Sequence, residues 1–389
     1  SYLRTYLTFY LTILKRLDKR NETAGQLHFP FLNFRKGQRE LAKYAYGIAK
    51  NGGSLFVEAP TGIGKTISTL YPFVRSFSEG KNDKIFYLTA KNSGKEAALQ
   101  AVELMKEKGV KLSEVVVTAK DKICFCVGKA CNPDECPFAK DYYTKIREVL
   151  TKSLARYDAF DPGRISRIAA AHHICPFELQ LDLSLYVDVI ICDYNYLFDP
   201  LVYFRRYFDN DASRMLVLVD EAHNLVDRGR DMYSASLDSL AFERARKAIR
   251  RLEHKKMKNA SKRIAKLFKE IKDSNNEQET IIESLDAKTI RALEAYLLAA
   301  QDINRNHHEY VDEHFRQFFL DVNRFLKIAE FIDDSFTIYV TKSGDDIARI
   351  SIFCLDPSRH LRKSLAQVRG RILFSATLSP HDYYVDVIG

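Results

Sequence analysis

The chain has no tryptophan, and its 389 residues contain no internal repeat and no low-complexity tract. No stretch approaches the roughly eighteen consecutive apolar residues that a membrane-spanning helix needs. Residues 2–17 are aromatic, but Arg4 and several threonines interrupt them, and no small-residue cleavage site follows. The sequence therefore predicts no transmembrane segment, no membrane partner and no secretion signal, and it favours an amphipathic helix over residues 2–17.

A disulfide framework is also lacking. The chain has seven cysteines, an odd number, and no secretory signal accompanies them. Disulfide-stapled domains belong to oxidising compartments and carry even numbers of cysteines, whereas thiols in reducing compartments are buried or bound to metal. The sequence therefore predicts an intracellular, cytoplasmic protein.

Acidic residues are in deficit, because 51 Asp and Glu oppose 60 Lys and Arg, which gives a net charge of +9. Such a charge permits a polyanionic partner. The deficit is concentrated in residues 242–272, where only Glu243, Glu253 and Glu270 are acidic. The basic residues of this run are Arg244, Arg246, Lys247, Arg250, Arg251, Lys255, Lys256, Lys258, Lys262, Arg263, Lys266, Lys269 and Lys272. A charge run usually marks a solvated helix face, but one so unbalanced favours nucleic-acid contact.

Apolar runs alternate with helical patterns along much of the chain. The runs are residues 54–59, 84–90, 115–118, 187–193, 215–220 and 371–375. This alternation predicts an α/β fold with a parallel sheet. Because a βαβ unit needs only about thirty residues, the long gaps must hold two insertions, one rich in cysteine and the other helical in composition throughout.

The first apolar run leads into the string Ala59-Pro60-Thr61-Gly62-Ile63-Gly64-Lys65-Thr66. A strand, a glycine-rich turn and a helix are the context of a phosphate-binding loop, whose backbone N–H groups cradle phosphates. Lys65 would reach the β- and γ-phosphates, and the Thr66 hydroxyl would hold Mg²⁺. Ala59 replaces the first glycine of the usual motif, but the half that touches phosphate is intact.

Two further strings follow buried runs. Asp220-Glu221-Ala222-His223 ends the run 215–219, and Ser375-Ala376-Thr377 ends the run 371–375. Parallel strands place ligands at their carboxyl ends, so Asp220 can hold Mg²⁺ while Glu221 polarises a water molecule. A lone Asp-Glu pair after a strand can equally be a solvated loop. Together with the phosphate-binding loop it predicts an ATPase.

Five cysteines gather in the first insertion. Cys124, Cys126, Cys131 and Cys136 lie close together in sequence, and Cys175 precedes Pro176. Four thiolates hold either a tetrahedral metal ion or an iron–sulfur cluster. Spacing decides neither between these groups nor which four of the five thiols would bind. Unliganded thiols are the alternative.

These motifs together resemble those of the XPD/DinG helicases, which are superfamily 2 DNA helicases with an iron–sulfur cluster. Further matching strings are Cys175-Pro176-Phe177, Asp193-Tyr194-Asn195-Tyr196-Leu197-Phe198-Asp199-Pro200 and Cys354-Leu355-Asp356-Pro357-Ser358. The resemblance runs from about Phe31 onward. It implies a RecA-like, P-loop parallel sheet carrying a cysteine-rich [4Fe–4S] insertion and an all-helical arch insertion.

The resemblance also implies roles for individual residues. Arg35 and Gln38 match the element that recognises adenine, and Thr61, Gly62, Ile63, Gly64, Lys65 and Thr66 match the phosphate loop. Asp220 with Thr66 would bind Mg²⁺, and Glu221 would be the catalytic base beside Lys65 and Asp220. The cluster ligands would be Cys124, Cys131, Cys136 and Cys175. Cys126 is left out, partly because only Phe125 separates it from Cys124.

The domains implied by the resemblance are the following. Residues 1–30 form a helical segment or linker; residues 31–118, 186–226 and 343–389 form motor domain 1; residues 119–185 form the cluster domain; and residues 227–342 form the arch. No second RecA-like domain fits, so the chain is expected to be a fragment of a longer helicase with weak activity on its own.

The expected cofactors are ATP, Mg²⁺ and the [4Fe–4S] cluster, and the expected partners are single-stranded and forked duplex DNA bound by a monomer. Tyr194, Tyr196 and Phe198 are candidate base-stacking residues, although core packing is expected for at least one of them. Three alternatives stay open: a DNA translocase or nuclease-associated motor that does not unwind, a zinc-stabilised RNA-dependent ATPase, and a redox-sensing module with a vestigial ATP site.

Overall fold

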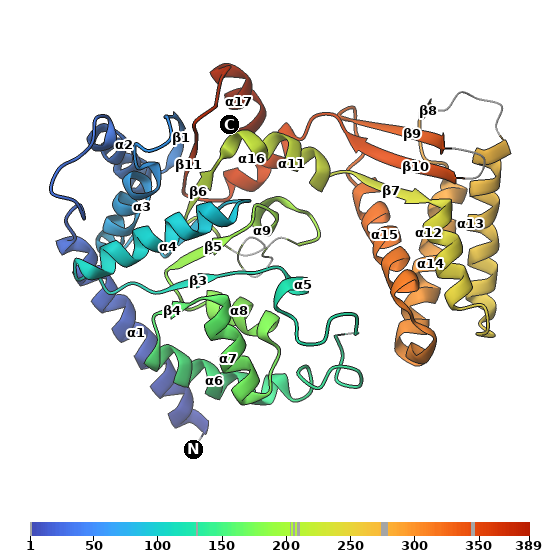
Figure 1. Cartoon of the computed structure of the whole chain (residues 1–389), viewed down its shortest axis with the longest axis horizontal. Coiled ribbons are helices and arrows are strands. Elements are labelled where there is room, and N and C mark those ends of the chain that lie inside the picture. The colour runs from blue at the N-terminus through green and yellow to red at the C-terminus, as the bar shows by residue number, and fades with distance from the viewer. Residues whose placement is uncertain are drawn as a thin grey trace. The chain divides into compact units, whose positions relative to one another are not determined.

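A computed structural model describes residues 2–129, 131–202, 204, 207, 211–273, 279–343 and 347–389. The chain divides into two compact units (Figure 1). The first comprises Ser1–Leu197, Phe204–Leu225 and Leu361–Gly389, and the second comprises Phe198–Tyr203 and Val226–His360. No described helix is both long enough and apolar enough to span a bilayer.

A seven-stranded parallel sheet forms the centre of the first unit, in the order β1-β11-β6-β2-β5-β3-β4. Its strands are β1 (Gly53–Glu58), β2 (Lys84–Leu88), β3 (Glu114–Val116), β4 (Ala159–Phe160), β5 (Val189–Cys192), β6 (Met215–Asp220) and β11 (Gly370–Ser375). The central strands are buried on both faces, as parallel strands flanked by helices are. The predicted α/β fold with a RecA-like parallel sheet is confirmed.

Helices cover this sheet. They are α1 (Tyr2–Gln26), α2 (Gln38–Asn51), α3 (Lys65–Arg75), α4 (Asn92–Glu107), α5 (Lys120–Ile123), α6 (Tyr142–Arg156), α7 (Pro162–His172), α8 (Pro176–Ser184), α9 (Asn195–Phe198) and α17 (His381–Ile388), with the 3₁₀ turns η1 (Ser76–Glu79) and η2 (Ala222–Asn224). Alternate strand residues, such as Ile85 with Tyr87 and Leu216 with Leu218, pack against α1 to α4 in one core. This layer fixes the strand ends that carry the predicted site.

Helix α1 is anchored to the sheet by a buried ion pair. The Arg20 guanidinium donates to Asp188 Oδ1 at 2.9 Å and to the Asp83 carbonyl at 3.0 Å, and it lies over the Phe77 ring. The other Asp188 oxygen accepts from the backbone N–H and the hydroxyl of Ser113. Both charges are therefore buried and paired, which makes the removal of either partner costly.

We expect Arg20→Met to destabilise the first unit by about 3–5 kcal/mol, because it removes the hydrogen-bonded cation that pairs with the buried Asp188 carboxylate. Urea unfolding at neutral pH measures the effect. Lys19→Met is the matched control, since Lys19 is exposed and pairs with the exposed Glu22; surface pairs contribute about 0–1 kcal/mol. Equal losses for the two variants would contradict the proposed anchoring role of Arg20.

The cysteine-rich insertion is continuous with the sheet. Strand β4, which lies within it, pairs in parallel with β3 and forms the sheet edge. The sequence analysis did not expect this strand, because two residues carry no readable periodicity. Helices α5 to α8 belong to the same insertion, and the expected cluster domain at residues 119–185 shares the compact unit of the motor sheet.

The second unit combines helices with an antiparallel sheet. Its strands are β7 (Ala235–Asp238), β8 (Glu279–Ile282), β9 (Phe336–Ser343) and β10 (Ile347–Cys354), in the order β7-β10-β9-β8. Its helices are α12 (Ser239–Ala248), α13 (Lys255–Asp273), α14 (Ala287–Asn306) and α15 (Glu313–Ala329), with the turn η3 (His308–Tyr310). Helices α11 (Leu225–Met232) and α16 (Ser358–Ala366) cross between the units.

The expectation of an all-helical insertion is therefore wrong. Strands β9 and β10 pair along their length from Cys354 opposite Phe336 to Ile347 opposite Ser343. Their β-branched and aromatic residues suit a pleated surface, a signal that the surrounding helical composition concealed. The compact unit also extends to His360, so the expected boundary after residue 342 falls within β9.

Candidate functional site

The predicted phosphate loop connects β1 to α3. Gly62 and Gly64 have φ values of 84° and 82°, a conformation that favours glycine. The Lys65 ammonium donates to the carbonyl oxygens of Ala59 at 2.7 Å and Pro60 at 3.1 Å. The lysine thus lies folded over the loop, at the N-terminus of α3, where backbone N–H groups and the helix dipole favour an anion.

The two residues expected to recognise adenine contact this loop. Gln38 is buried, and its Oε1 accepts from the Arg35 backbone N–H at 2.7 Å. A Cβ atom at Gly64 would lie only 2.3 Å from Gln38 Nε2 and would displace the Gln38 amide, and the φ of 82° also favours glycine there. The Arg35 guanidinium donates to the Gly62 carbonyl. The structure therefore brings both residues to the phosphate loop.

Asp220 lies at the end of β6, between β11 and β2. Burial is the main cause that raises the pKa of Asp220, and the neighbouring Glu221 charge adds to it, whereas Lys65 opposes it. The Tyr87 hydroxyl hydrogen-bonds Asp220 and lies 3.4 Å from Thr66 Oγ1. Tyr87 therefore links the two predicted Mg²⁺ ligands. This role of Tyr87 could not be read from the sequence, because an aromatic residue in a buried strand suggests core packing.

Three side chains lie beside the Glu221 carboxylate. Ser375 Oγ lies 3.2 Å and His223 Nδ1 lies 3.4 Å from Glu221 Oε2, and the Lys91 ammonium lies 3.9 Å from Glu221 Oε1. Ser375 Oγ also lies 2.7 Å from His223 Nδ1. The Ser375 hydroxyl also accepts from the Thr377 backbone N–H. Ser375 thus connects the Ser375-Ala376-Thr377 motif to the motif that begins at Asp220. The sequence analysis did not identify Lys91, which precedes α4.

The five cysteines of the insertion are free thiols in one neighbourhood. Cys126 Sγ contacts Cys136, and the Cys126 backbone N–H donates to Cys124 Sγ at 3.3 Å. Cys175 precedes α8, accepts from two backbone N–H groups at that helix end, and interacts with Cys131. The structure does not separate Cys126 from the four predicted ligands.

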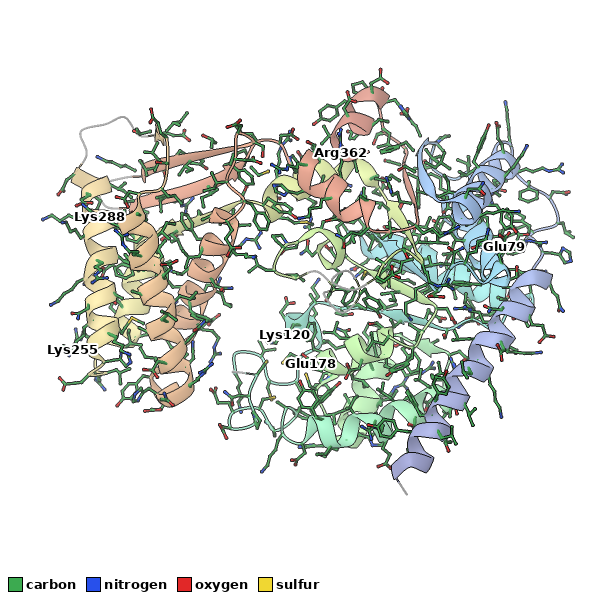
Figure 2. The ribbon with its side chains drawn as sticks, turned by 180° about the vertical axis from the view of Figure 1, so that it is seen from behind. Glu79, Lys120, Glu178, Lys255, Lys288 and Arg362 are labelled. Atoms are coloured by element: carbon green, nitrogen blue, oxygen red, sulfur yellow. The ribbon has the colours of Figure 1, made fainter. Side chains whose placement is uncertain are left out.

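Lys120, at the start of α5, reaches into this group (Figure 2). Burial is the largest single effect and opposes the Lys120 charge, but the hydrogen bond to Cys131 and the charges of the nearby thiols together outweigh it and raise the pKa of Lys120. The charges of Cys124 and Cys175 act in the same direction. A cation among sulfur atoms is what a set of thiolates would require, so the donor chemistry fits a four-thiolate group.

Metal-binding geometry itself is not formed. Within the described part of the chain, no three or more His, Cys, Asp or Glu side chains are arranged to hold a metal ion. Instead, Cys126 contacts Cys136, while Cys124, Cys131 and Cys175 interact with Lys120. The cysteine cluster is therefore supported by proximity and residue type, not by closed coordination.

The proposed stacking residues are not available to bases. Tyr194, Tyr196 and Phe198 are exposed by only 0%, 6% and 1%. The Tyr194 hydroxyl donates to the Asp220 carbonyl, and the Tyr196 ring stacks on Phe204. All three side chains are therefore buried instead of free to stack on bases, and Tyr194 supports the Asp220 turn.

Comparisons with known proteins agree with this geometry. The DEAD_2 family model matches residues 96–241. The chain is 22% identical over 269 residues to the general transcription and DNA repair factor IIH helicase subunit XPD of Dictyostelium discoideum, which covers 59% of this chain and 32% of the relative. It is 22% identical over 247 residues to the ATP-dependent DNA helicase XPD of Sulfolobus acidocaldarius, which covers 62% and 41%.

Solved structures give the same result for the fold. A structure titled "Truncated XPD" aligns with a TM-score of 0.63 at 18% identity, over 90% of this chain and 96% of that one. Another, titled "XPD_Helicase", aligns with a TM-score of 0.60, over 92% and 61%. The chain matches less than half of the length of the curated relatives. In sequence and fold it resembles the XPD-like helicases of superfamily 2, and the predicted resemblance is confirmed.

Proposed function

We propose that this chain is the first motor domain, with its insertions, of an ATP-dependent DNA helicase of the XPD/DinG type. The proposal rests on three motifs that meet at the carboxyl ends of neighbouring parallel strands. Lys65 and Thr66 lie in the loop and helix after β1, Asp220 ends β6 and Glu221 follows it. Ser375 ends β11, which lies between these two strands. This arrangement can bind a triphosphate, hold a metal ion beside it and orient water.

Each residue has a separate task in the proposed reaction. Lys65 leaves the Ala59 and Pro60 carbonyls and donates instead to the β- and γ-phosphates. Thr66 and Asp220 would hold Mg²⁺, which neutralises phosphate charge when bound. Glu221 orients the attacking water and accepts its proton. A second RecA-like domain would complete the cleft with arginines.

Ser375 couples this reaction to movement in the proposal. Its hydroxyl contacts Glu221 and His223, while the next residues leave β11 through Thr377, whose N–H donates to the same hydroxyl. A change at Glu221 on hydrolysis would therefore alter the turn after β11. We propose that this change moves single-stranded DNA, so that a forked duplex is separated.

We further propose that Cys124, Cys131, Cys136 and Cys175 hold a [4Fe–4S] cluster, with Lys120 compensating thiolate charge. The group would join the loop around residues 124–136 to the start of α8, which are distant in sequence. Cys126 is the competing ligand because of its contact with Cys136. A single zinc ion is the alternative occupant of the same thiolates.

A test of the proposed function uses a fluorescent, non-hydrolysable ATP analogue with and without Mg²⁺. We expect Mg²⁺ to tighten binding to the wild type by about tenfold or more, and Asp220→Asn to remove most of this gain, because the substitution removes a charged Mg²⁺ ligand. Asp83→Asn, which alters an exposed carboxylate on the opposite edge of the sheet, is the control. Binding that is independent of both Mg²⁺ and Asp220 would sink the proposal.

Unwinding is tested separately with the full-length protein on a forked DNA. Strand separation that requires ATP supports a helicase, whereas ATP-driven displacement along single-stranded DNA without separation supports the translocase alternative. RNA that stimulates hydrolysis more strongly than DNA would favour an RNA-dependent ATPase. Affinity for single-stranded DNA should also fall steeply with added salt.

A further inference from the structure

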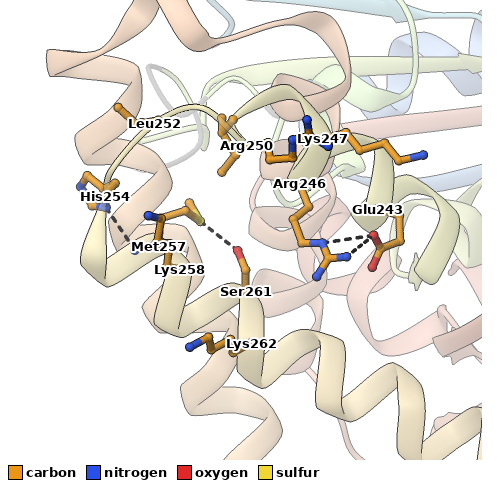
Figure 3. Close-up of a pocket in the computed structure, with 11 residues that line it drawn as sticks. Glu243, Arg246, Lys247, Arg250, Leu252, His254, Met257, Lys258, Ser261 and Lys262 are labelled. Carbon is orange, nitrogen blue, oxygen red and sulfur yellow. Dashed lines mark hydrogen bonds and ion pairs between the residues drawn. The ribbon is translucent and has the colours of Figure 1, made fainter.

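A basic pocket lies in the second unit, between α12 and α13 and over the connection that joins them (Figure 3). Its volume is about 450 Å³, which is within the usual range of ligand pockets. It is lined by Glu243, Arg246, Lys247, Ile249, Arg250, Leu252, His254, Met257, Lys258, Ser261 and Lys262. Five of these residues are cations and only one is a carboxylate.

Carboxylates pair with two of the five cations of this pocket. Arg246 pairs with Glu243 at 2.7 Å, and Lys258 pairs with Glu253 at 3.6 Å. Lys247, Arg250 and Lys262 make no ion pair with any residue that the structure describes. All three are exposed at the rim, so the pocket presents three uncompensated positive charges to solvent.

On α13, Lys262 belongs to a row of three lysines, and it is the one of these for which the described residues supply no carboxylate partner. Lys258, Lys262 and Lys266 succeed one another at four-residue intervals, so their side chains follow one row of the helix. Like charges at this spacing destabilise a helix by a few tenths of a kcal/mol per pair. The opposite face of α13 buries Ile264 and Phe268, which holds the helix in place without the lysines.

The floor of the pocket is apolar and fixed. Ile249 and Met257 are buried there, with Leu252 beside them. The His254 ring is held at both nitrogens, because Nδ1 accepts from the Met257 backbone N–H at 3.1 Å and Nε2 lies 2.9 Å from Asp302 Oδ2. The Ser261 hydroxyl is nearly buried, and the acceptor it reaches is the Met257 sulfur at 3.5 Å. A ligand oxygen would be a better partner for that hydroxyl.

We propose that this pocket binds one nucleotide unit of a single-stranded nucleic acid. Its phosphates contact Lys247, Arg250 and Lys262, and its sugar and base lie on the apolar floor. A nucleotide places an anion and a flat, weakly polar face within one unit, which an aspartate or glutamate side chain does not. The inference rests on the proposed function, to which it adds a second nucleic-acid contact away from the motor sheet.

The experiment combines affinity with a protection map on the full chain. A fluorescein-labelled oligothymidylate is titrated by anisotropy at several salt concentrations. Lys262→Gln should weaken binding about fivefold at 0.1 M salt and flatten the logarithmic salt dependence by about 0.7, which corresponds to one lost phosphate contact on a single strand. Lys269→Gln, which makes the same charge change on α13 outside the pocket, should have a smaller effect.

Lysine acetylation with and without the oligonucleotide then locates the contact. Lys247, Lys258 and Lys262 should be protected, whereas Lys269 and Lys288 should react as before. Oligonucleotide binding without this protection overturns the pocket but leaves the proposed function, whereas an absence of any oligonucleotide binding counts against both. Equal protection by thymidine monophosphate overturns the assignment to a single strand in favour of free nucleotides. Equal protection by polyglutamate overturns the inference in favour of an acidic peptide.

Discussion

Replacement of Lys65 by alanine is expected to weaken binding of Mg²⁺–ATP by about a hundredfold. Lys65 is the only lysine in the string from Ala59 to Thr66, and it is the first residue of α3. Charge-assisted hydrogen bonds contribute about 1.5–3 kcal/mol each, and every 1.4 kcal/mol corresponds to tenfold in affinity. Two such bonds to the β- and γ-phosphates are therefore sufficient for this loss. Isothermal titration of wild type and variant measures it.

The fold should tolerate this change, because the hydrogen bonds that the Lys65 ammonium makes to the described residues go to two carbonyl oxygens of its own loop. The melting temperature of Lys65→Ala is accordingly expected to stay near that of the wild type. Lys81→Ala removes a charge from an exposed loop of the same unit and serves as the control. If Lys65→Ala bound Mg²⁺–ATP as well as Lys81→Ala, the proposed phosphate site would be wrong.

The motor sheet could be predicted because its strands are uninterrupted apolar runs. Residues 215–220 form β6 as expected, and residues 371–375 lie within β11. A parallel strand that is buried on both faces needs such a run, so an uninterrupted apolar run in the sequence predicts a central strand. The position of the motifs could be predicted too, because residues that follow parallel strands lie together at the carboxyl ends of those strands.

The second unit was harder to predict because its strands are amphipathic. In β10, Arg349 alternates with buried Ala348 and Ile350, which resembles other mixed segments of the region. The residues that connect the motifs were equally hidden. Tyr87 links Thr66 to Asp220, and Lys120 lies among the cysteines, but both contacts join positions that only the folded topology brings together.

The solvent exposure of individual aromatic side chains also could not be predicted from residue type. Tyr194 resembles a stacking residue in sequence, yet its ring is completely buried and its hydroxyl supports the Asp220 backbone. The basic run, in contrast, does reach solvent, and α12 and α13 arrange part of it around a pocket. Nucleic-acid contact is therefore better sought among these lysines and arginines than among the aromatic residues after β5.

Replacement of Cys175 by serine is expected to remove nearly all iron from protein purified without oxygen. The wild type should contain about four iron atoms per chain and absorb broadly near roughly 400 nm, as a cluster held by four thiolates does. Cys175 is the ligand farthest in sequence from the others, so its loss also frees α8 from the loop around residues 124–136. Iron and sulfide analysis with the absorption spectrum measures the outcome.

The remaining cysteines make this prediction selective. Cys192 is buried in β5, away from the cluster, so Cys192→Ser should retain its iron. Cys126→Ser decides between the two ligand sets, because the Cys126 thiol contacts Cys136. Retention of iron by Cys126→Ser supports Cys124, Cys131, Cys136 and Cys175 as ligands, whereas its loss would bring Cys126 into the set. One zinc ion per wild-type chain, with no iron, would contradict the cluster while leaving the ATP site unaffected, since no cysteine contacts Lys65, Asp220 or Glu221 among the described residues.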